Sequence, residues 1–276
     1  MYAVIGDPIA HSLSPVIHHA FAEQHSMALS YSSYQISIEQ LPEFINSWRQ
    51  RGGIGLNVTH PLKKRALMLC HTKSLQAQQA MAASTITISS SSKHYHADNF
   101  DGPGLVNDLS RRHQFNLTNK NILIIGAGGA AHAILPALIE SKPKKICITN
   151  KTPSNAQALI KPYQNSHIPC TTIPTDQPHH SFDLIINATA AGFYHSAPVF
   201  HASVIHPTSF CYDLSYGSAA RPFLTLARRY GAADIADGLG MLIEHHVLAF
   251  LLWHQLDIDS DSVYNFLRTK NPLNAL

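Results

Sequence analysis

The sequence N-I-L-I-I-G-A-G-G-A-A-H-A-I-L-P-A-L-I-E, residues Asn121–Glu140, joins an apolar run to a helical pattern through three glycines. The apolar run, Asn121–Ile125, is typical of a strand buried on both faces of a parallel sheet. Gly126 suits the tight turn after such a strand, and Gly128 lets backbone N–H groups approach a pyrophosphate at the positive end of the helix. Ala131 is small enough for close packing of helix on strand. The stretch therefore predicts a dinucleotide-binding turn in preference to a purely structural one.

The strand that follows refines the expected cofactor. Lys145–Thr149 is a second apolar run. At its end, about 20 residues beyond the glycines, an NAD-binding protein usually presents Asp or Glu to the ribose 2′-hydroxyl. This chain has Asn150, Lys151 and Thr152 there instead. A lysine between amide and hydroxyl neighbours suits a 2′-phosphate, so the sequence favours NADP over NAD; the alternative is a solvated loop lysine.

The composition is that of an ordinary globular protein. The chain has 276 residues, which is enough for two hydrophobic cores. Hydrophobic residues make up 45% and charged residues 13%, and a net charge of +3 is too small for a nucleic-acid-binding protein. The longest apolar stretch, near Val247–Trp253, is too short to span a bilayer. Neither a nucleic acid nor a membrane is therefore expected as a partner.

Cysteine and histidine usage predicts a cytoplasmic protein without a metal site. Met1 leads directly into a predicted strand, Tyr2–Ile5, which leaves no room for a signal peptide. No H-E-x-x-H motif or Cys/His cluster organises the 19 histidines, so no metal is expected. The four cysteines lack C-x-x-C spacing and are expected to be reduced, mostly buried thiols: Cys70, Cys147, Cys170 and Cys211.

The N-terminal part alternates strands with helices. Ser14 is a candidate N-cap with Pro15 at the first helical position, and Ser37 with Gln40 forms a capping box. The predicted strands are Tyr2–Ile5, Tyr31–Ile36 and Ile54–Val58, the predicted helices are 15–25, 37–50 and 74–82, and a hairpin is predicted from Ser84–Ile88, the turn Ser89–Ser92 and Lys93–Ala97.

Polar residues at the ends of these strands are candidates for a ligand site, because open α/β sheets bind ligands at that edge. Helix capping does not account for Ser12. Asn57 and Thr59 end the third strand, and Lys63 falls in the first turn of the next helix. The helix dipole disfavours a cation at this position, so the presence of Lys63 there indicates a functional role, in acting on a substrate. The alternative to a functional role is a surface lysine whose side chain extends into solvent, and this interpretation fits Lys64 better than Lys63.

Alternation continues in the second half, with strands Leu184–Asn187 and Phe210–Leu214 and a helix from Pro222 to Tyr230. This order predicts parallel sheets in both halves. The glycine-rich segments Asp98–Gly104 and Asp237–Gly240 are the expected crossings between two domains, although an aspartate in the first could equally cap the helix that follows it. The first expected domain comprises residues 1–102 and is completed by 239–276, which contain the predicted helices Met241–Trp253 and Ser260–Arg268. The second expected domain comprises residues 103–238, and its first predicted helix is Leu105–His113.

With these elements assembled, the chain resembles the shikimate dehydrogenase family over nearly its whole length. The resemblance implies NADPH-dependent reduction of 3-dehydroshikimate to shikimate, on the pathway to aromatic amino acids. It also implies a two-domain α/β fold, in which a substrate domain and a Rossmann-type domain with a doubly wound parallel sheet close over a cleft. The motifs occur in the family's order: Gly6–Pro15, Asn57-Val58-Thr59 with Lys63, Asp98-Asn99 before Asp101-Gly102, Gly126–Ala131, Asn187-Ala188-Thr189, Tyr212-Asp213-Leu214 and Asp237–Leu242.

The resemblance implies roles for individual residues. Lys63 and Asp101 match the catalytic pair beside the reacting carbonyl, where an ammonium stabilises developing negative charge. Ser12 and Ser14 match the serines that hold the substrate carboxylate. The other matched substrate residues are Asn57, Thr59, Ser84, Tyr216 and His245, and the matched cofactor residues are Gly126, Ala127, Gly128, Gly129, Ala130, Asn150, Lys151, Thr152, Asn187, Thr189, Gly238 and Met241.

Five positions depart from the family pattern. Ser84 stands where the family usually has asparagine, Phe100 where it has threonine, and His245 where it has glutamine. Lys151 and Asn155 stand where the family has two arginines around the 2′-phosphate. Because lysine lacks the bidentate fork of arginine, these two changes weaken the expected preference for NADP.

Three functions remain open at this point. The favoured one is an NADP-dependent shikimate dehydrogenase, acting as a monomer or homodimer. The second is a paralogue that acts on quinate or another cyclic hydroxy acid with NAD or NADP. The third is a catalytically poor nucleotide-binding protein with a regulatory or structural role. The altered pocket residues motivate the last two, whereas the presence of Lys63 and Asp101 counts against the third.

Overall fold

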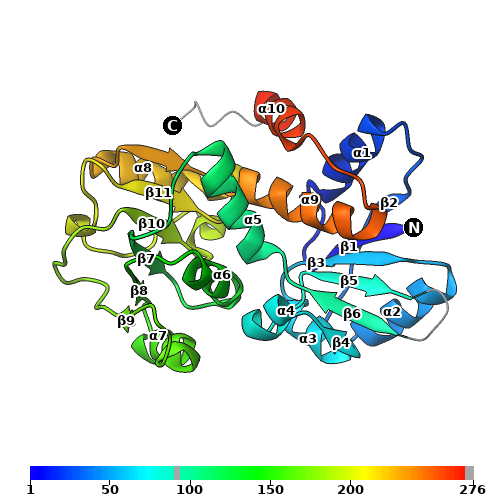
Figure 1. Ribbon diagram of the computed structural model, residues 1–276, viewed down its shortest axis with the longest axis horizontal. Helices are drawn as coiled ribbons and strands as arrows, with labels where there is room; N and C mark the ends of the chain where they lie inside the picture. The colour runs from blue at the N-terminus through cyan, green and yellow to red at the C-terminus, as the bar shows by residue number, and fades with distance from the viewer. Residues whose placement is uncertain (90–93, 271–276) are drawn as a thin grey trace. The chain divides into compact units, whose positions relative to one another are not determined.

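The structure, a computed structural model, describes residues 1–89 and 94–270, so most of the predicted turn Ser89–Ser92 lies outside the described residues. The chain divides into two compact units. Unit 1 comprises Met1–Gly104 and Ile243–Phe266, and unit 2 comprises Leu105–Leu242 and the residues from Leu267 on. Each unit has its own six-stranded sheet with helices (Figure 1). The expected two-domain α/β fold is therefore confirmed.

The sheet of unit 1 is mixed, with the strand order β2-β1-β3-β5-β6-β4. β1 (Tyr2–Gly6) pairs in parallel with β2 (Tyr31–Gln35) and β3 (Gly55–Val58). The expectation of a purely parallel sheet is wrong here, because β5 runs antiparallel to both β3 and β6. β5 ends at Ile88 and β6 begins at Tyr95, so the connection is too short for the crossover that a parallel pair of these two strands would need. The remaining strands are β4 (Thr72–Lys73), β5 (Thr85–Ile88) and β6 (Tyr95–Asp98).

Helices cover both faces of this sheet. One face packs through residues such as Ile5, Leu56 and Ile86 against α2 (Leu41–Gln50), α3 (Lys63–Leu69) and α4 (Leu75–Ala80). The other face packs against α1 (Ser14–Gln24) and α9 (Leu239–His254), where Phe21 contacts Phe250 and Tyr2 contacts Trp253.

Two predicted capping interactions differ from the structure. Leu13 occupies the N-cap position of α1, so Ser14 is the first helical residue and its hydroxyl does not cap the helix. Ser37 and Gln40 do exchange the two hydrogen bonds of a capping box, but α2 begins only at Leu41. The Ser14 hydroxyl is thereby left for tertiary contacts.

The sheet of unit 2 is parallel throughout, with the order β12-β11-β10-β7-β8-β9. The strand order reverses between β7 and β10, which is where doubly wound sheets bind ligands. Three of the four strands predicted here have the predicted bounds: β7 (Asn121–Ile125), β8 (Lys145–Thr149) and β10 (Leu184–Asn187). The fourth, predicted as Phe210–Leu214, ends one residue earlier. The others are β9 (Cys170–Thr172), β11 (Phe210–Asp213) and β12 (Asp234–Ala236).

Successive side chains of β7 point alternately to the two faces of this sheet. Ile122 and Ile124 face the helix α6 (Gly129–Glu140), whereas Leu123 and Ile125 face α8 (Arg221–Arg229). The further helices are α5 (Asp101–Asn107), a π-helical turn Asp108–Arg112, α7 (Pro153–Ile160), α10 (Ser260–Lys270) and 3-10 turns at Lys161–Tyr163, Ala191–Tyr194, Ala202–Val204 and Gly217–Ala219. Within residues 1–89 and 94–270, every helix is too short or too polar to traverse a lipid bilayer.

The first boundary between the units, Gly104 to Leu105, lies inside α5 at the end of the glycine-rich segment Asp98–Gly104. The other two boundaries lie inside α9 and α10. Both segments are partly helical, since α5 begins at Asp101 and α9 at Leu239. A Cβ atom at Gly240 would overlap the carboxylate of Asp108, which shows how closely the start of α9 approaches that side chain.

Candidate active site

Unit 1 brings Lys63 and Asp101 together. Lys63 is the first residue of α3 and Asp101 the first residue of α5, and Lys63 Nζ donates a hydrogen bond to Asp101 Oδ2 at 2.5 Å. The Asp101 side chain is 9% exposed, whereas 29% of the Lys63 side chain is exposed. The pair therefore presents an ammonium group to solvent with a buried carboxylate behind it.

The surroundings of Asp101 keep it ionised. Burial alone would raise the pKa of this carboxyl, but the charge of Lys63 and the hydrogen bond from His245 outweigh burial and hold the pKa well below its usual range. The backbone N–H of Asp101 donates to Asn99 Oδ1 at 3.1 Å, which fixes the start of α5. Asp101 is thus a positioned carboxylate at neutral pH.

A line of hydrogen bonds supports this carboxylate from the other side. His245 Nδ1 lies 3.1 Å from Asp101 Oδ1, and Asn57 Nδ2 lies 3.3 Å from His245 Nε2. The Tyr31 hydroxyl donates to Asn57 Oδ1 at 2.7 Å. Because the Asn57 amide offers an N–H to Nε2, the arrangement fits a His245 whose Nδ1–H donates to Asp101. Both ring nitrogens of His245 therefore have partners within unit 1.

The two predicted carboxylate-binding serines also meet. Ser12 Oγ donates to Ser14 Oγ at 3.0 Å, and His246 Nε2 lies 2.8 Å from the same Ser14 oxygen. Sequence reasoning did not single out His246. The available signal was a second histidine beside His245 in the middle of an otherwise apolar helix.

Ser84 and Thr59 have mainly structural contacts in unit 1. Ser84 is fully buried, and its Oγ accepts the backbone N–H of Phe100 at 2.9 Å. The hydroxyl that faces Asn57 belongs instead to Thr85, which accepts from Asn57 Nδ2 at 3.2 Å and was missed by sequence reasoning. Thr59 follows β3 directly, and its backbone N–H donates to a carbonyl of β1.

Unit 2 contains the predicted glycine turn. Gly126 has a φ of +108°, and a Cβ atom there would approach the carbonyl of Ala188 to 3.0 Å, so glycine is required by the fold. At Gly128 and Gly129, in contrast, a Cβ atom would meet no protein atom within 4 Å. No side chain caps α6, and Ala130 in its first turn is exposed. The protein itself does not require Gly128 or Gly129, which fits close approach by a ligand.

The loop after β8 lies next to this turn. The backbone N–H of Ala127 donates to Asn150 Oδ1 at 3.2 Å, and Asn150 Nδ2 donates to the carbonyl of Thr152. Lys151 and Thr152 are exposed. The structure therefore places an exposed lysine on the loop that Asn150 ties to the glycine turn.

Polar residues at the ends of β10 and β11 form a largely buried cluster. Asn187 Nδ2 donates to Asp213 Oδ2 at 2.7 Å, and the Thr189 hydroxyl donates to Asn187 Oδ1 at 2.8 Å. Burial raises the pKa of the Asp213 carboxyl to about 7, against the opposing effect of hydrogen bonds from Asn187 and Ser215. Asn187 and Thr189 are thus held at the edge of the sheet by this contact.

The last predicted residues of unit 2 lie around the start of α9. A Cβ atom at Gly238 would come within 2.2 Å of the Leu214 carbonyl oxygen, and the backbone N–H of Met241 donates to the Tyr212 hydroxyl at 3.3 Å. Tyr216 is half-buried and precedes the turn Gly217–Ala219.

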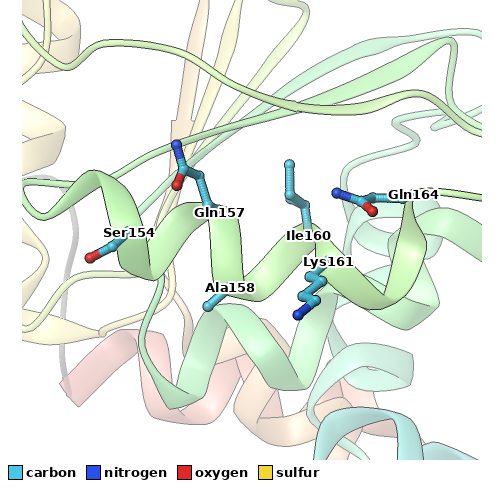
Figure 2. Close-up of a pocket in the computed structure, with 6 residues that line it drawn as sticks. All are labelled: Ser154, Gln157, Ala158, Ile160, Lys161 and Gln164. Carbon is cyan, nitrogen blue, oxygen red and sulfur yellow. The ribbon is translucent and has the colours of Figure 1, made fainter.

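Two other features of the described residues offer no built ligand site. No group of three or more His, Cys, Asp or Glu side chains among them is arranged to hold a metal ion. A shallow hollow of about 410 Å³ lies along α7 and the turn that follows it. Its lining side chains leave the helix in different directions and do not converge on one point (Figure 2).

Comparison with known proteins assigns the family. Residues 4–86 match the sequence model described as shikimate dehydrogenase substrate binding domain, and residues 108–208 match shikimate / quinate 5-dehydrogenase. A shikimate dehydrogenase (NADP(+)) from Coxiella burnetii is 41% identical, over 97% of this chain and 98% of its own. The chain belongs to the shikimate dehydrogenase family. Another shikimate dehydrogenase (NADP(+)), from Nitrosomonas eutropha, is 37% identical over 99% of both chains.

Solved structures of similar proteins have the same fold. An Ael1 enzyme from Pseudomonas putida superimposes with a TM-score of 0.88 and 35% identity, over 96% of this chain and 97% of the other. Shikimate 5-dehydrogenase from Thermus thermophilus, in complex with NADP(H) and shikimate, gives a TM-score of 0.82 and 30% identity, over 94% and 95% of the two chains. The resemblance inferred from the motifs is thus confirmed for the family.

Proposed function

We propose that this chain is an NADP-dependent shikimate dehydrogenase, which reversibly reduces 3-dehydroshikimate to shikimate on the route to chorismate and the aromatic amino acids. The observation that carries the proposal is the contact between the exposed ammonium of Lys63 and the buried carboxylate of Asp101, in a chain 41% identical to a shikimate dehydrogenase (NADP(+)). An oxidoreductase that acts on a CH–OH group needs such a pair beside the oxygen that gains or loses a proton.

In this proposal Lys63 and Asp101 act on the substrate oxygen. The Lys63 ammonium stabilises the negative charge that develops on the carbonyl oxygen as the bond to hydrogen forms. Asp101 holds Lys63 in place, and the pair exchanges the proton with the oxygen. His245 and Asn57 keep the Asp101 carboxylate in one orientation.

The glycine turn of unit 2 is the proposed NADP site. The backbone of Gly126, Ala127, Gly128, Gly129 and Ala130 would hold the pyrophosphate, because the open space at the start of α6 fits a closely approaching anion. When bound, the cofactor supplies or accepts the hydride. The 2′-phosphate would contact Asn150, Lys151 and Thr152, and the remaining proposed cofactor contacts are Asn187, Thr189, Gly238 and Met241.

The substrate is proposed to bind through its carboxylate and its ring hydroxyls. Ser12 and Ser14 would hold the carboxylate, since two hydroxyls 3.0 Å apart can both turn toward an anion. The proposed ring contacts are Asn57, Thr59, Ser84, His245 and Tyr216. His245 and Asn57 already contact each other, so a ring hydroxyl bound there would meet a preformed polar group.

A second candidate is a paralogue that oxidises quinate or another cyclic hydroxy acid. It is favoured by Ser84 and Phe100, which depart from the family pattern beside Asp101. A purely regulatory nucleotide-binding role has no such support, because the Lys63–Asp101 contact is formed. We further propose that the enzyme works in the cytoplasm, since its four cysteines are free thiols. A monomer or a homodimer is the proposed assembly.

The proposed function is tested by measuring turnover of shikimate and of quinate, each with NADP and with NAD. Shikimate with NADP is expected to give the highest kcat/KM of the four combinations. A higher value with quinate would replace the first candidate by the second, and no turnover in any combination would refute both.

A further inference from the structure

Two buried histidines stand behind Ser14 in unit 1. His18 on α1 and His246 on α9 are 0% and 1% exposed. His18 Nε2 lies 3.1 Å from His246 Nδ1, and His246 Nε2 lies 2.8 Å from Ser14 Oγ. A continuous line of hydrogen bonds therefore runs from the interior of the unit to a proposed substrate-binding hydroxyl.

Both histidines are neutral. Burial lowers the pKa of His18 and of His246 well below the usual range, and neighbouring histidines act in the same direction. A neutral imidazole has one N–H and one acceptor nitrogen. The line can thus run in only two ways: outward, with His18 donating to His246 and His246 to Ser14, or inward, with Ser14 donating to His246.

The surroundings of His18 favour the outward direction. Its ring stacks on Tyr31 with centroids 4.1 Å apart and meets Phe21 edge-on. None of the described residues hydrogen-bonds His18 Nδ1. The inward direction would put an N–H on that nitrogen, and buried N–H groups without an acceptor are rarer in proteins than acceptors without a donor. The outward direction leaves only a lone pair there.

We propose that His246, supported by His18, is a positioning residue that makes the Ser14 hydroxyl a donor to an anionic group of the substrate. When Ser14 Oγ accepts from His246 Nε2, the hydroxyl hydrogen is free to point at a carboxylate. In the inward direction the same hydrogen would be used on His246. The inference rests on the proposed function, which assigns Ser14 to the substrate carboxylate, and it adds the residue that orients that contact.

Two variants of similar size separate donation from packing. His246→Gln keeps an N–H donor, whereas His246→Met fills the space without one. His19→Ala, which changes an exposed histidine of α1 next to His18, is the control. The dissociation constants of shikimate and of its methyl ester are measured by titration calorimetry, and the kcat and the KM for NADP with shikimate are measured alongside. The ester lacks the anion but keeps the ring hydroxyls.

The wild-type protein should prefer shikimate over the ester, and His246→Met should reduce that ratio of dissociation constants by about tenfold, the usual effect of losing one hydrogen bond to a charged group. His246→Gln should retain most of the ratio, and the KM for NADP should be unchanged in both variants. A general packing defect would weaken both ligands equally and leave the ratio unchanged.

Two results would overturn the inference: a wild-type ratio in His246→Met, or an equal loss of the ratio in His246→Gln and His246→Met. The failure of the proposed function looks different, since the wild-type protein itself would then not oxidise shikimate with NADP.

Discussion

Ser84 and Phe100 are joined by one hydrogen bond directly before Asp101. The short Ser84 side chain uses its oxygen on the Phe100 backbone and is fully buried, so it offers little to a substrate hydroxyl. An asparagine in its place has both an acceptor for that N–H and donors for a ring hydroxyl. These two residues therefore decide how well the proposed pocket fits shikimate.

We expect the double variant Ser84→Asn with Phe100→Thr to raise kcat/KM for shikimate. A hydroxyl left unpaired in a closed pocket costs about 1–3 kcal/mol, or roughly 5- to 150-fold. Steady-state kinetics of the wild type and the double variant would measure the gain. If the double variant instead loses activity on shikimate, the pocket is adapted to another substrate.

Lys151 carries the expected preference for NADP. It is exposed on the loop that Asn150 links to the glycine turn. Lys151→Ala should raise the KM for NADP about tenfold, because an exposed charged contact to a phosphate is lost, and should leave the KM for NAD nearly unchanged. Lys144→Ala, another exposed lysine of unit 2, is the control. Equal KM values for NADP in the wild type and Lys151→Ala would remove Lys151 from the proposed site.

Individual contacts were the hardest part to predict from the sequence. Lys63 and Asp101 were predicted because a cation at the start of a helix and an aspartate in a family motif can both be recognised in the sequence alone. His246 and Thr85 were missed, because their partners Ser14 and Asn57 are distant in sequence and meet only through the packing of α9 and the pairing of β3 with β5.

At the scale of elements, the glycines of the turn before α6 should respond differently to the same substitution. Gly126→Ala should destabilise the protein by about 1–3 kcal/mol, because its φ of +108° strains any side chain. Gly128→Ala should leave the melting temperature unchanged, because its Cβ atom meets no protein atom. It should nevertheless raise the KM for NADP. Thermal unfolding and cofactor kinetics of the two variants check this, and an unchanged KM in Gly128→Ala would contradict the proposed pyrophosphate site.

Strands were predicted better than helix starts. Nearly continuous apolar runs predicted β7, β8 and β10 with their observed ends, because a strand buried on both faces is apolar except at its ends. The starts of α1, α5 and α9 differ from prediction. Serine, aspartate and glycine there are used for tertiary contacts, so residues typical of caps and turns were misleading.

For the whole molecule, Asp213 should make stability depend on pH. Its folded pKa of about 7 lies above the unfolded value of 3.8, so its contribution to stability is full below pH 3.8 and is lost as the pH rises through 7. His18 and His246 act oppositely below pH 6.5, because their folded pKa values are lowered. Comparison with Asp213→Asn cancels the histidines and isolates the carboxyl.

The free energy of unfolding of the wild type minus that of Asp213→Asn should fall by at most about 1.4 kcal/mol per pH unit between pH 4 and 7 and then become constant. Urea denaturation of both proteins at several pH values measures this difference. A difference independent of pH over that range would show that Asp213 titrates normally in the folded protein.

If Lys63 acts on the reacting oxygen in a shikimate dehydrogenase, the kcat with shikimate and NADP must fall when its ammonium group is removed in Lys63→Ala. Lys64→Ala is the matched control, since Lys64 is the exposed neighbour on the same helix. We predict that Lys63→Ala lowers kcat by about 10²–10⁴-fold with little change in the KM for NADP, while Lys64→Ala retains wild-type turnover. Near-full turnover by Lys63→Ala would contradict the claim.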